Sequence, residues 1–212
     1  DKIEDPQAYV PNLSMSETGI GTNIYIRGIG SGINPGFEQS VGMYFDGVSY
    51  SRAQLTRAPF LDLARVEVLR GPQNILYGKN SIAGALSLVS ARPGQEQEGM
   101  ISGLYEPDHD EKIVDFMVSG PITDTLGARV AIRKREFGGY IENLTLNRDE
   151  PQRDESTIRA ILDWDATPDL TAMLKFELGK FDVLGRQVEI VNDQPSAILG
   201  GATYSQALAG SF

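Results

Sequence analysis

From Gly99 onward, apolar residues alternate with polar ones, and this period of two restricts the possible folds more than any other feature. The apolar positions are 114, 116 and 118; 128, 130 and 132; 158 to 164 in steps of two; and 170 to 178 in steps of two. Charged residues such as Arg129, Arg159 and Lys175 occupy only the positions between them. Successive side chains of a strand point to opposite faces, so each stretch has one apolar and one charged face. The pattern predicts strands near 99–106, 112–120, 126–137, 156–165 and 170–182.

Alternation alone also fits a soluble β-sandwich, so the lengths of the strands and connections have to separate the two classes. The predicted strands have about 9–11 residues, as tilted transmembrane strands do. Tight connections at Gly120–Thr125 and Ala166–Asp169 flank a long polar one at Gly138–Glu155. Short turns on one side and longer loops on the other are typical of outer-membrane barrels. We therefore predict that residues 94–212 are antiparallel strands of a transmembrane β-barrel.

Residues 1–93 show a different pattern, with short apolar stretches separated by glycine and proline. Period-two alternation and turn signals predict strands at Thr22–Arg27, Val41–Val48, Ala64–Leu69 and Ala85–Val89, with a reversal at Asp46-Gly47. Capping residues and proline predict helical segments at Asp5–Tyr9, Ala58–Leu63 and Gln73–Tyr77. These elements together predict a small mixed α/β domain.

Several short motifs occur in a fixed order in this first part. They are Ile26–Gly28, Val41–Val48, Arg65–Pro72 (RVEVLRGP), Leu76–Gly78, Gly84-Ala85 and Arg92-Pro93. In this order they resemble the plug domain of TonB-dependent outer-membrane receptors. Gly138–Asn143 is loosely similar to a segment of the barrels of that family.

The resemblance implies a plug over residues 1–93 and the first five strands of a barrel over residues 94–212. Plugged transporters of this kind use about 22 strands. We therefore expect the chain to be a fragment, with residues 183–212 in an outer loop and the family's coupling box missing.

The family's activity is the uptake of a scarce nutrient, most often a ferric siderophore, across the bacterial outer membrane. The resemblance thus implies three partners: the energy-transducing TonB complex, outer-membrane lipid with lipopolysaccharide, and a small-molecule ligand. A ferric chelate would be cargo, and no cofactor is expected. The alternative is an outer-membrane signalling receptor or a surface-binding protein that transports nothing.

Two arginines, Arg27 and Arg70, each end a predicted plug strand just before a glycine. In the family, arginines at the matching positions pair with barrel glutamates, which implies a plug–barrel latch to which Glu67 also contributes. A buried arginine needs such a partner because an unpaired buried charge is costly. Two exposed arginines are the alternative interpretation.

Apical plug loops imply a ligand-binding region, because loops on a rigid scaffold commonly carry binding function. The candidate residues are Phe37, Glu38, Tyr50 and Arg52. Only their position in the chain supports this expectation.

Composition excludes several other classes of function. The net charge is −10 and there is no cysteine, which argues against a nucleic-acid partner and excludes thiol chemistry within the chain. Two glycine-rich segments, at Gly28–Ile33 and Gly78–Ser81, fail the nucleotide-binding patterns. His109 lies among carboxylates at a predicted loop tip, which favours a solvated loop over a cation site. No catalytic or metal site is predicted, so we do not expect an enzyme.

Overall fold

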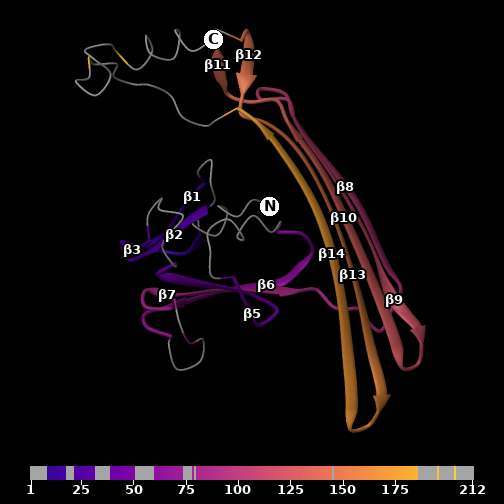
Figure 1. Ribbon diagram of the computed structural model, residues 1–212. Helices are drawn as coiled ribbons and strands as arrows, with labels where there is room; N and C mark the ends of the chain where they lie inside the picture. The colour runs from indigo at the N-terminus through magenta and orange to yellow at the C-terminus, as the bar shows by residue number, and fades with distance from the viewer. Residues whose placement is uncertain are drawn as a thin grey trace.

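The computed structural model describes residues 9–17, 22–31, 39–50, 60–73, 78, 80–144, 146–185, 195 and 203. Two small sheets formed by the first part of the chain lie beside one long, curved sheet formed by the second part (Figure 1). None of the described residues forms a helix long and apolar enough to cross a membrane.

The two small sheets pack around a shared apolar core. The first has the order β1(Leu13–Glu17)-β2(Thr22–Ile26)-β3(Ile29–Gly30), and the second has the order β5(Val48–Tyr50)-β4(Val41–Phe45)-β7(Gly84–Ser90)-β6(Leu63–Arg70). β4 and β7 are parallel, and every other pair is antiparallel. The core includes Ile24 and Ile26 from the first sheet and Met43, Leu86 and Leu88 from the second.

The predicted strands and reversal of this region are confirmed. β2, β4, β6 and β7 match their predicted ranges to within a few residues. Asp46 and Gly47 both have positive φ, at 48° and 82°, and join β4 to β5 in a two-residue hairpin.

The helical part of the mixed α/β prediction is not confirmed: the described elements are all strands, and Tyr9 is the one helical residue among the described residues. The segments at Asp5–Tyr9 and Gln73–Tyr77 lie largely outside the described residues. The prediction for Ala58–Leu63 is wrong at its end, because Leu63 already begins β6. Asp62 has a φ of 50°, which a right-handed helix excludes, and its carbonyl accepts a hydrogen bond from Ala91 N at 3.0 Å.

The long sheet contains the five strands expected after residue 98. Its order is β14(Leu170–Leu184)-β13(Gln152–Thr167)-β10(Leu126–Phe137)-β9(Glu111–Thr123)-β8(Glu98–Glu106), antiparallel throughout. The segment between β10 and β13, expected as a long loop, contains the unpredicted hairpin β11(Ile141–Asn143)–β12(Arg148–Glu150). This hairpin lies at the upper end of the long sheet in Figure 1.

The strand register separates the side chains of the long sheet into two faces. One row of neighbouring residues crosses the sheet as Ser102, Asp115, Arg133, Thr157 and Gly179, and this inner face points toward the small sheets. The outer face carries the alternating apolar residues, which are exposed: Ile101, Val114, Phe116, Val118, Ile132, Ile158, Leu162, Trp164, Leu170, Leu174, Phe176 and Leu178. The predicted separation into an apolar and a charged face is therefore present.

Candidate functional site: the ionic seam

A set of ion pairs and hydrogen bonds joins the inner face of the long sheet to the small sheets. We call it the ionic seam, and its side chains are Asp46, Asp62, Asp115, Arg129, Arg133, Arg159, Lys175 and Glu177. The cations come from β10, β13 and β14, because alternation places these charged residues opposite the apolar face.

Arg129 makes a two-pronged ion pair with Asp62, which lies just before β6. Arg129 Nε and Nη2 donate to the two carboxylate oxygens of Asp62 at 2.7 and 2.6 Å. The side chains are only 10% and 11% exposed. Parallel N–H···O bonds of this kind fix orientation as well as distance. The pair therefore fixes the beginning of β6 against β10.

Lys175 of β14 binds the hairpin between β4 and β5. Its Nζ lies 2.6 Å from Asp46 Oδ2 and 3.1 Å from Ser90 Oγ. Ser90 donates to the same carboxylate from its backbone N and its hydroxyl, each at 2.8 Å. Burial opposes ionisation of Asp46, but the hydrogen bonds from Lys175 and Ser90 outweigh it and hold the pKa of Asp46 below its ordinary value.

Arg159 is the most deeply buried charge of the seam, with 1% of its side chain exposed. Its Nε donates to Glu177 at 2.6 Å, and its Nη1 donates to the carbonyl of Leu61. Its guanidinium lies 4.8 Å from the centre of the Phe45 ring, and Lys175 Nζ lies 3.5 Å from the same centre. Nη2 of Arg159 has no hydrogen-bond partner among the described residues. Two cations thus contact one aromatic ring of β4.

Arg133 of β10 also contacts the loop at residues 60–62, which precedes β6. Its Nε and Nη2 donate to Asp115 of β9 at 2.6 and 2.9 Å, and its Nη1 donates to the carbonyl of Phe60 at 3.3 Å. A small apolar cluster of Leu61, Met117 and Ala131 lies beside these contacts. The loop at residues 60–62 is therefore held by both charge and packing.

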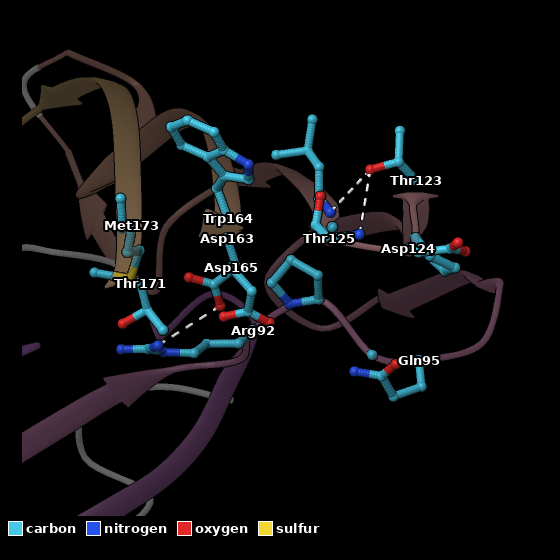
Figure 2. A pocket seen from close by; sticks show the side chains of 16 residues that line it. Arg92, Gln95, Thr123, Asp124, Thr125, Asp163, Trp164, Asp165, Thr171 and Met173 are labelled. Atoms are coloured by element: carbon cyan, nitrogen blue, oxygen red, sulfur yellow. Dashed lines mark hydrogen bonds and ion pairs between the residues drawn. The ribbon is translucent and has the colours of Figure 1, made fainter. Parts of the chain in front are cut away.

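The linker from β7 to β8 is bound to the turn end of the long sheet. Gly94 N donates to Ser119 Oγ at 3.3 Å, and Gln97 Nε2 donates to the carbonyl of Pro121 at 3.0 Å. Figure 2 shows Arg92 directed toward Asp163, with 3.6 Å between Nη1 and Oδ2. Arg92, Gly94, Pro121 and Asp163 are among the residues that line a polar cavity of about 430 Å³ at the turns.

The predicted latch residues lie away from the seam. Arg27 and Arg70 are both exposed, and neither forms an ion pair with another described residue. Glu67 accepts a hydrogen bond from Arg65 Nε at 2.6 Å instead. The strands that the latch requires would lie beyond this chain, so the latch stays a prediction.

Of the predicted ligand-binding residues, only Tyr50 is among the described residues. Its half-buried ring packs edge-on against Phe45, with the ring centres 6.3 Å apart. Burial, together with the charge of Glu177, raises the pKa of Tyr50. Tyr50 thus packs beside the seam, whereas Phe37, Glu38 and Arg52 lie outside the described residues.

His109 lies at the opposite end of the long sheet, in the turn between β8 and β9. Its Nδ1 is 2.9 Å from Glu106 Oε2, and its ring stacks on Phe137 with centres 6.0 Å apart. Across the described part of the chain, no three acidic, histidine or cysteine side chains are grouped so that they could hold a metal ion.

Sequence reasoning missed the function of the seam cations. Alternation placed Arg129, Arg133, Arg159 and Lys175 on the charged face, but nothing in the pattern distinguishes a solvated face from one that contacts another domain. The only available signal was that the apolar face of the alternating stretches carries no charge, which indicates that the charged face is the one directed away from lipid.

Comparison with known proteins finds similarity to TonB-dependent receptors. The profile described as TonB-dependent Receptor Plug Domain matches residues 2–85. The pesticin receptor of Yersinia pestis is 29% identical over 96% of this chain and 32% of its own length. The ferrioxamine B receptor of Salmonella typhimurium is 28% identical over 66% of this chain and 20% of its own length.

Solved structures give the same result. The ferric yersiniabactin uptake receptor of Yersinia pestis has a TM-score of 0.69 and 28% identity over 80% of this chain and 27% of its own. The pyoverdine receptor of Pseudomonas aeruginosa, with a TM-score of 0.68 over 92% of this chain and 27% of its own, has 20% identity and supports the fold alone. This chain spans about a third of the length of its first curated relatives, 32%.

Proposed function

We propose that this chain belongs to the TonB-dependent receptors, whose plug profile matches residues 2–85. In this proposal it forms the plug and the first five barrel strands of an outer-membrane transporter for a ferric siderophore. The plug would comprise residues 1–93 and the barrel part residues 94–212. The relatives named above for ferrioxamine B and ferric yersiniabactin support this class of ligand.

The exposed apolar face of the long sheet is the observation that carries the proposal. Leu174 is 66% exposed, Phe176 60% and Leu178 62%, although all three are large and apolar. An apolar area of this extent is unusual on a soluble protein and is expected where a strand faces lipid. Outer-membrane lipid and lipopolysaccharide are therefore the proposed surroundings of this face.

The unpaired edges of the long sheet support a larger closed barrel. No other described strand pairs with the outer edges of β8 and β14. Unpaired backbone groups cost several kcal/mol each in a bilayer. Further strands of the parent receptor would pair with both edges and close the sheet around the small sheets.

The seam supports a plug that is held in place until energy is supplied. Breaking a buried ion pair is strongly destabilising, so thermal motion rarely separates the plug from the barrel at these points. In the proposed cycle, ligand binds from outside and the TonB complex then pulls on the plug from the periplasm to open a path.

Uptake in living cells tests the proposal. The complete receptor that contains this chain is expressed in an iron-limited strain that lacks its own siderophore receptors. The probes are radioiron complexes of yersiniabactin, ferrioxamine B and enterobactin. We expect energy-dependent uptake of at least one complex, and loss of that uptake when TonB is deleted.

The same experiment separates the alternative functions. A signalling receptor or a surface-binding protein would bind a complex on the cell surface without accumulating its iron. Binding of that kind, with no uptake of any complex in the TonB-positive strain, would overturn the transport proposal.

A further inference from the structure

The outer face of the long sheet is apolar over most of its length but charged at the end that carries β11–β12 (Figure 1). Two neighbouring rows of the strand register cross this end. The outermost row consists of Tyr105, Lys112, Glu136, Asp154 and Asp182. The second row consists of Gly103, Val114, Lys134, Ser156 and Lys180. The next row toward the turns is wholly apolar, with Ile101, Phe116, Ile132, Ile158 and Leu178. We call the first two rows the charged band.

The charges of the band are held by exposed ion pairs. Lys180 Nζ lies 2.8 Å from Asp182 Oδ2, with side chains 76% and 61% exposed. Lys134 Nζ binds Asp154 Oδ1, and these side chains are 41% and 54% exposed. β10, which carries Lys134, is the middle strand of the sheet, so this exposure does not come from an unpaired edge. Because exposed pairs contribute little to stability, both ammonium groups can exchange their carboxylates for other anions.

The position of the band along the strands corresponds to a membrane boundary. Trp164, half exposed on the same face, lies near the turn end of β13, eight residues from Ser156 and ten from Asp154. A strand rises about 3.3 Å per residue, so the two rows lie about 26–33 Å from Trp164 along β13. A barrel tilt of about 40° reduces this to about 20–25 Å along the membrane normal, close to the apolar band of about 25 Å in such barrels. The charged band therefore lies at the level of lipid headgroups.

The two ends of the outer face also differ in charge. Lys112, Lys134 and Lys180 all lie in the band, whereas the turn end of this face carries no cation among the described residues. Longer connections mark the external side of outer-membrane barrels, and the long connection that contains β11–β12 leaves the sheet at the band. The external leaflet of that membrane consists of lipopolysaccharide with phosphorylated headgroups. Lysines near a membrane surface are attracted to anionic headgroups.

From this arrangement we infer that the charged band is a docking surface for the phosphorylated headgroups of lipopolysaccharide. The inference rests on the proposed function and assigns one end of the outer face to the external leaflet. Lys134 and Lys180 lie in the row next to the apolar surface, where headgroup phosphates meet acyl chains. They are two strands apart, about 10 Å, so one headgroup can contact both. Glu136, Asp154 and Asp182 lie one row further out, where sugar hydroxyls can donate to their carboxylates.

Binding of lipopolysaccharide to the complete receptor in detergent tests the inference. The variants are Lys180→Gln and the double variant Lys134→Gln/Lys180→Gln. Arg65→Gln is the control, because Arg65 is an exposed cation, at 60%, that lies on β6 and not on the outer face. The probes are radiolabelled lipopolysaccharide, the same lipopolysaccharide after removal of its phosphates, and phosphatidylglycerol. Only receptor with the heat-modifiable mobility of the folded form is measured.

One lysine near an anionic surface contributes about fivefold to binding. We therefore expect lipopolysaccharide to bind about fivefold more weakly to Lys180→Gln and about 25-fold more weakly to the double variant, with no change for Arg65→Gln. Lipopolysaccharide without phosphates should bind all four proteins equally weakly. Lys180→Gln decides the question if the double variant does not fold.

Two results would overturn the inference. One is equal binding of lipopolysaccharide by the parent and the folded lysine variants, and the other is the same dependence on the lysines with phosphatidylglycerol. Either result would leave uptake of the radioiron complexes, and with it the transport proposal, intact. Absence of uptake by the unmodified receptor would instead overturn the proposed function, on which the inference rests.

Discussion

The outer face of the long sheet exposes apolar side chains, whereas its inner face buries charged ones. On the outer face, large apolar side chains such as Leu174 and Phe176 are exposed, at 66% and 60%. On the inner face, the Arg159 and Arg129 side chains are only 1% and 10% exposed. A soluble sheet has the reverse arrangement. The difference is what the proposed function expects of strands with two non-aqueous neighbours, lipid on the outer side and the packed small sheets on the inner side.

The strongest test of this contrast removes the buried charge. Replacing Arg159 by Ala leaves Glu177 with only the more distant Lys175, at 3.7 Å, and removes one of the two cations at Phe45, so we expect a loss of about 3–5 kcal/mol of unfolding free energy. The measurement is denaturant unfolding of the purified receptor in detergent. The double variant Arg159→Leu/Glu177→Leu should recover part of the loss, because an apolar pair replaces a broken ionic one. A single variant as stable as the parent would contradict the buried seam.

The next test places a charge on the other face. Leu174→Arg should cost about 2–4 kcal/mol if Leu174 faces the middle of the bilayer, and less folded receptor should reach the membrane. Leu184→Arg is the control, since Leu184 shares the outer face but ends β14, where the cost falls to about 0–1 kcal/mol. Heat-modifiable mobility on gels reports the folded fraction. Equal effects at the two positions would argue against a lipid-facing surface.

A smaller loss of unfolding free energy is expected when Asp46 is replaced. Asp46→Asn removes the charge that Lys175 and Ser90 bind, and a hydrogen bond to a charged group contributes about 1.5–3 kcal/mol. The pKa of Asp46 is lowered from its ordinary 3.8, so its stabilisation is complete above that value and is lost as the pH falls below it. Unfolding measured from neutral to strongly acidic pH should therefore show a steeper acid loss for the parent than for Asp46→Asn. Parallel curves would contradict the assignment.

The smallest loss of unfolding free energy is expected for the solvent-exposed ion pair between Arg65 and Glu67. Arg65→Ala breaks the pair with Glu67, whose side chains are 60% and 39% exposed. Exposed pairs contribute at most about 1 kcal/mol, and salt screens them. Unfolding at low and high salt provides the measurement. A loss comparable to that of Arg159→Ala would show that burial does not govern the strength of these pairs.

The sequence was sufficient for the parts of the fold that depend on local pattern. Alternation located all five strands of the long sheet and both of its faces, because the period of a strand is fixed by the backbone. The Asp46-Gly47 hairpin was predictable because only a few residue types adopt positive φ readily. The same logic failed before β6, where Asp62 takes a positive φ while Arg129 binds its carboxylate and Ala91 its carbonyl.

Contacts between distant segments could not be predicted in the same way. Lys175 and Asp46 are 129 residues apart, and the sequence gives no reason to choose Asp46 over another acidic residue. Arg27 and Arg70 were predicted as site residues because they lie in recognisable motifs. Arg159 lies in an alternating strand that has no such motif. Motifs thus indicated which family the chain resembles, whereas the register of the long sheet identified the residues that join the two parts.

The close fit of the linker has a consequence for receptors made by recombination. A Cβ added to Gly127 would lie 2.8 Å from Cβ of Pro93, so β10 lacks a side chain where the linker passes. Under the proposed division into plug and barrel, a chimaera that joins residues 1–93 to a foreign barrel must therefore inherit the glycine along with the linker. The unit that can be exchanged is then larger than residues 1–93: it extends across the linker into β10.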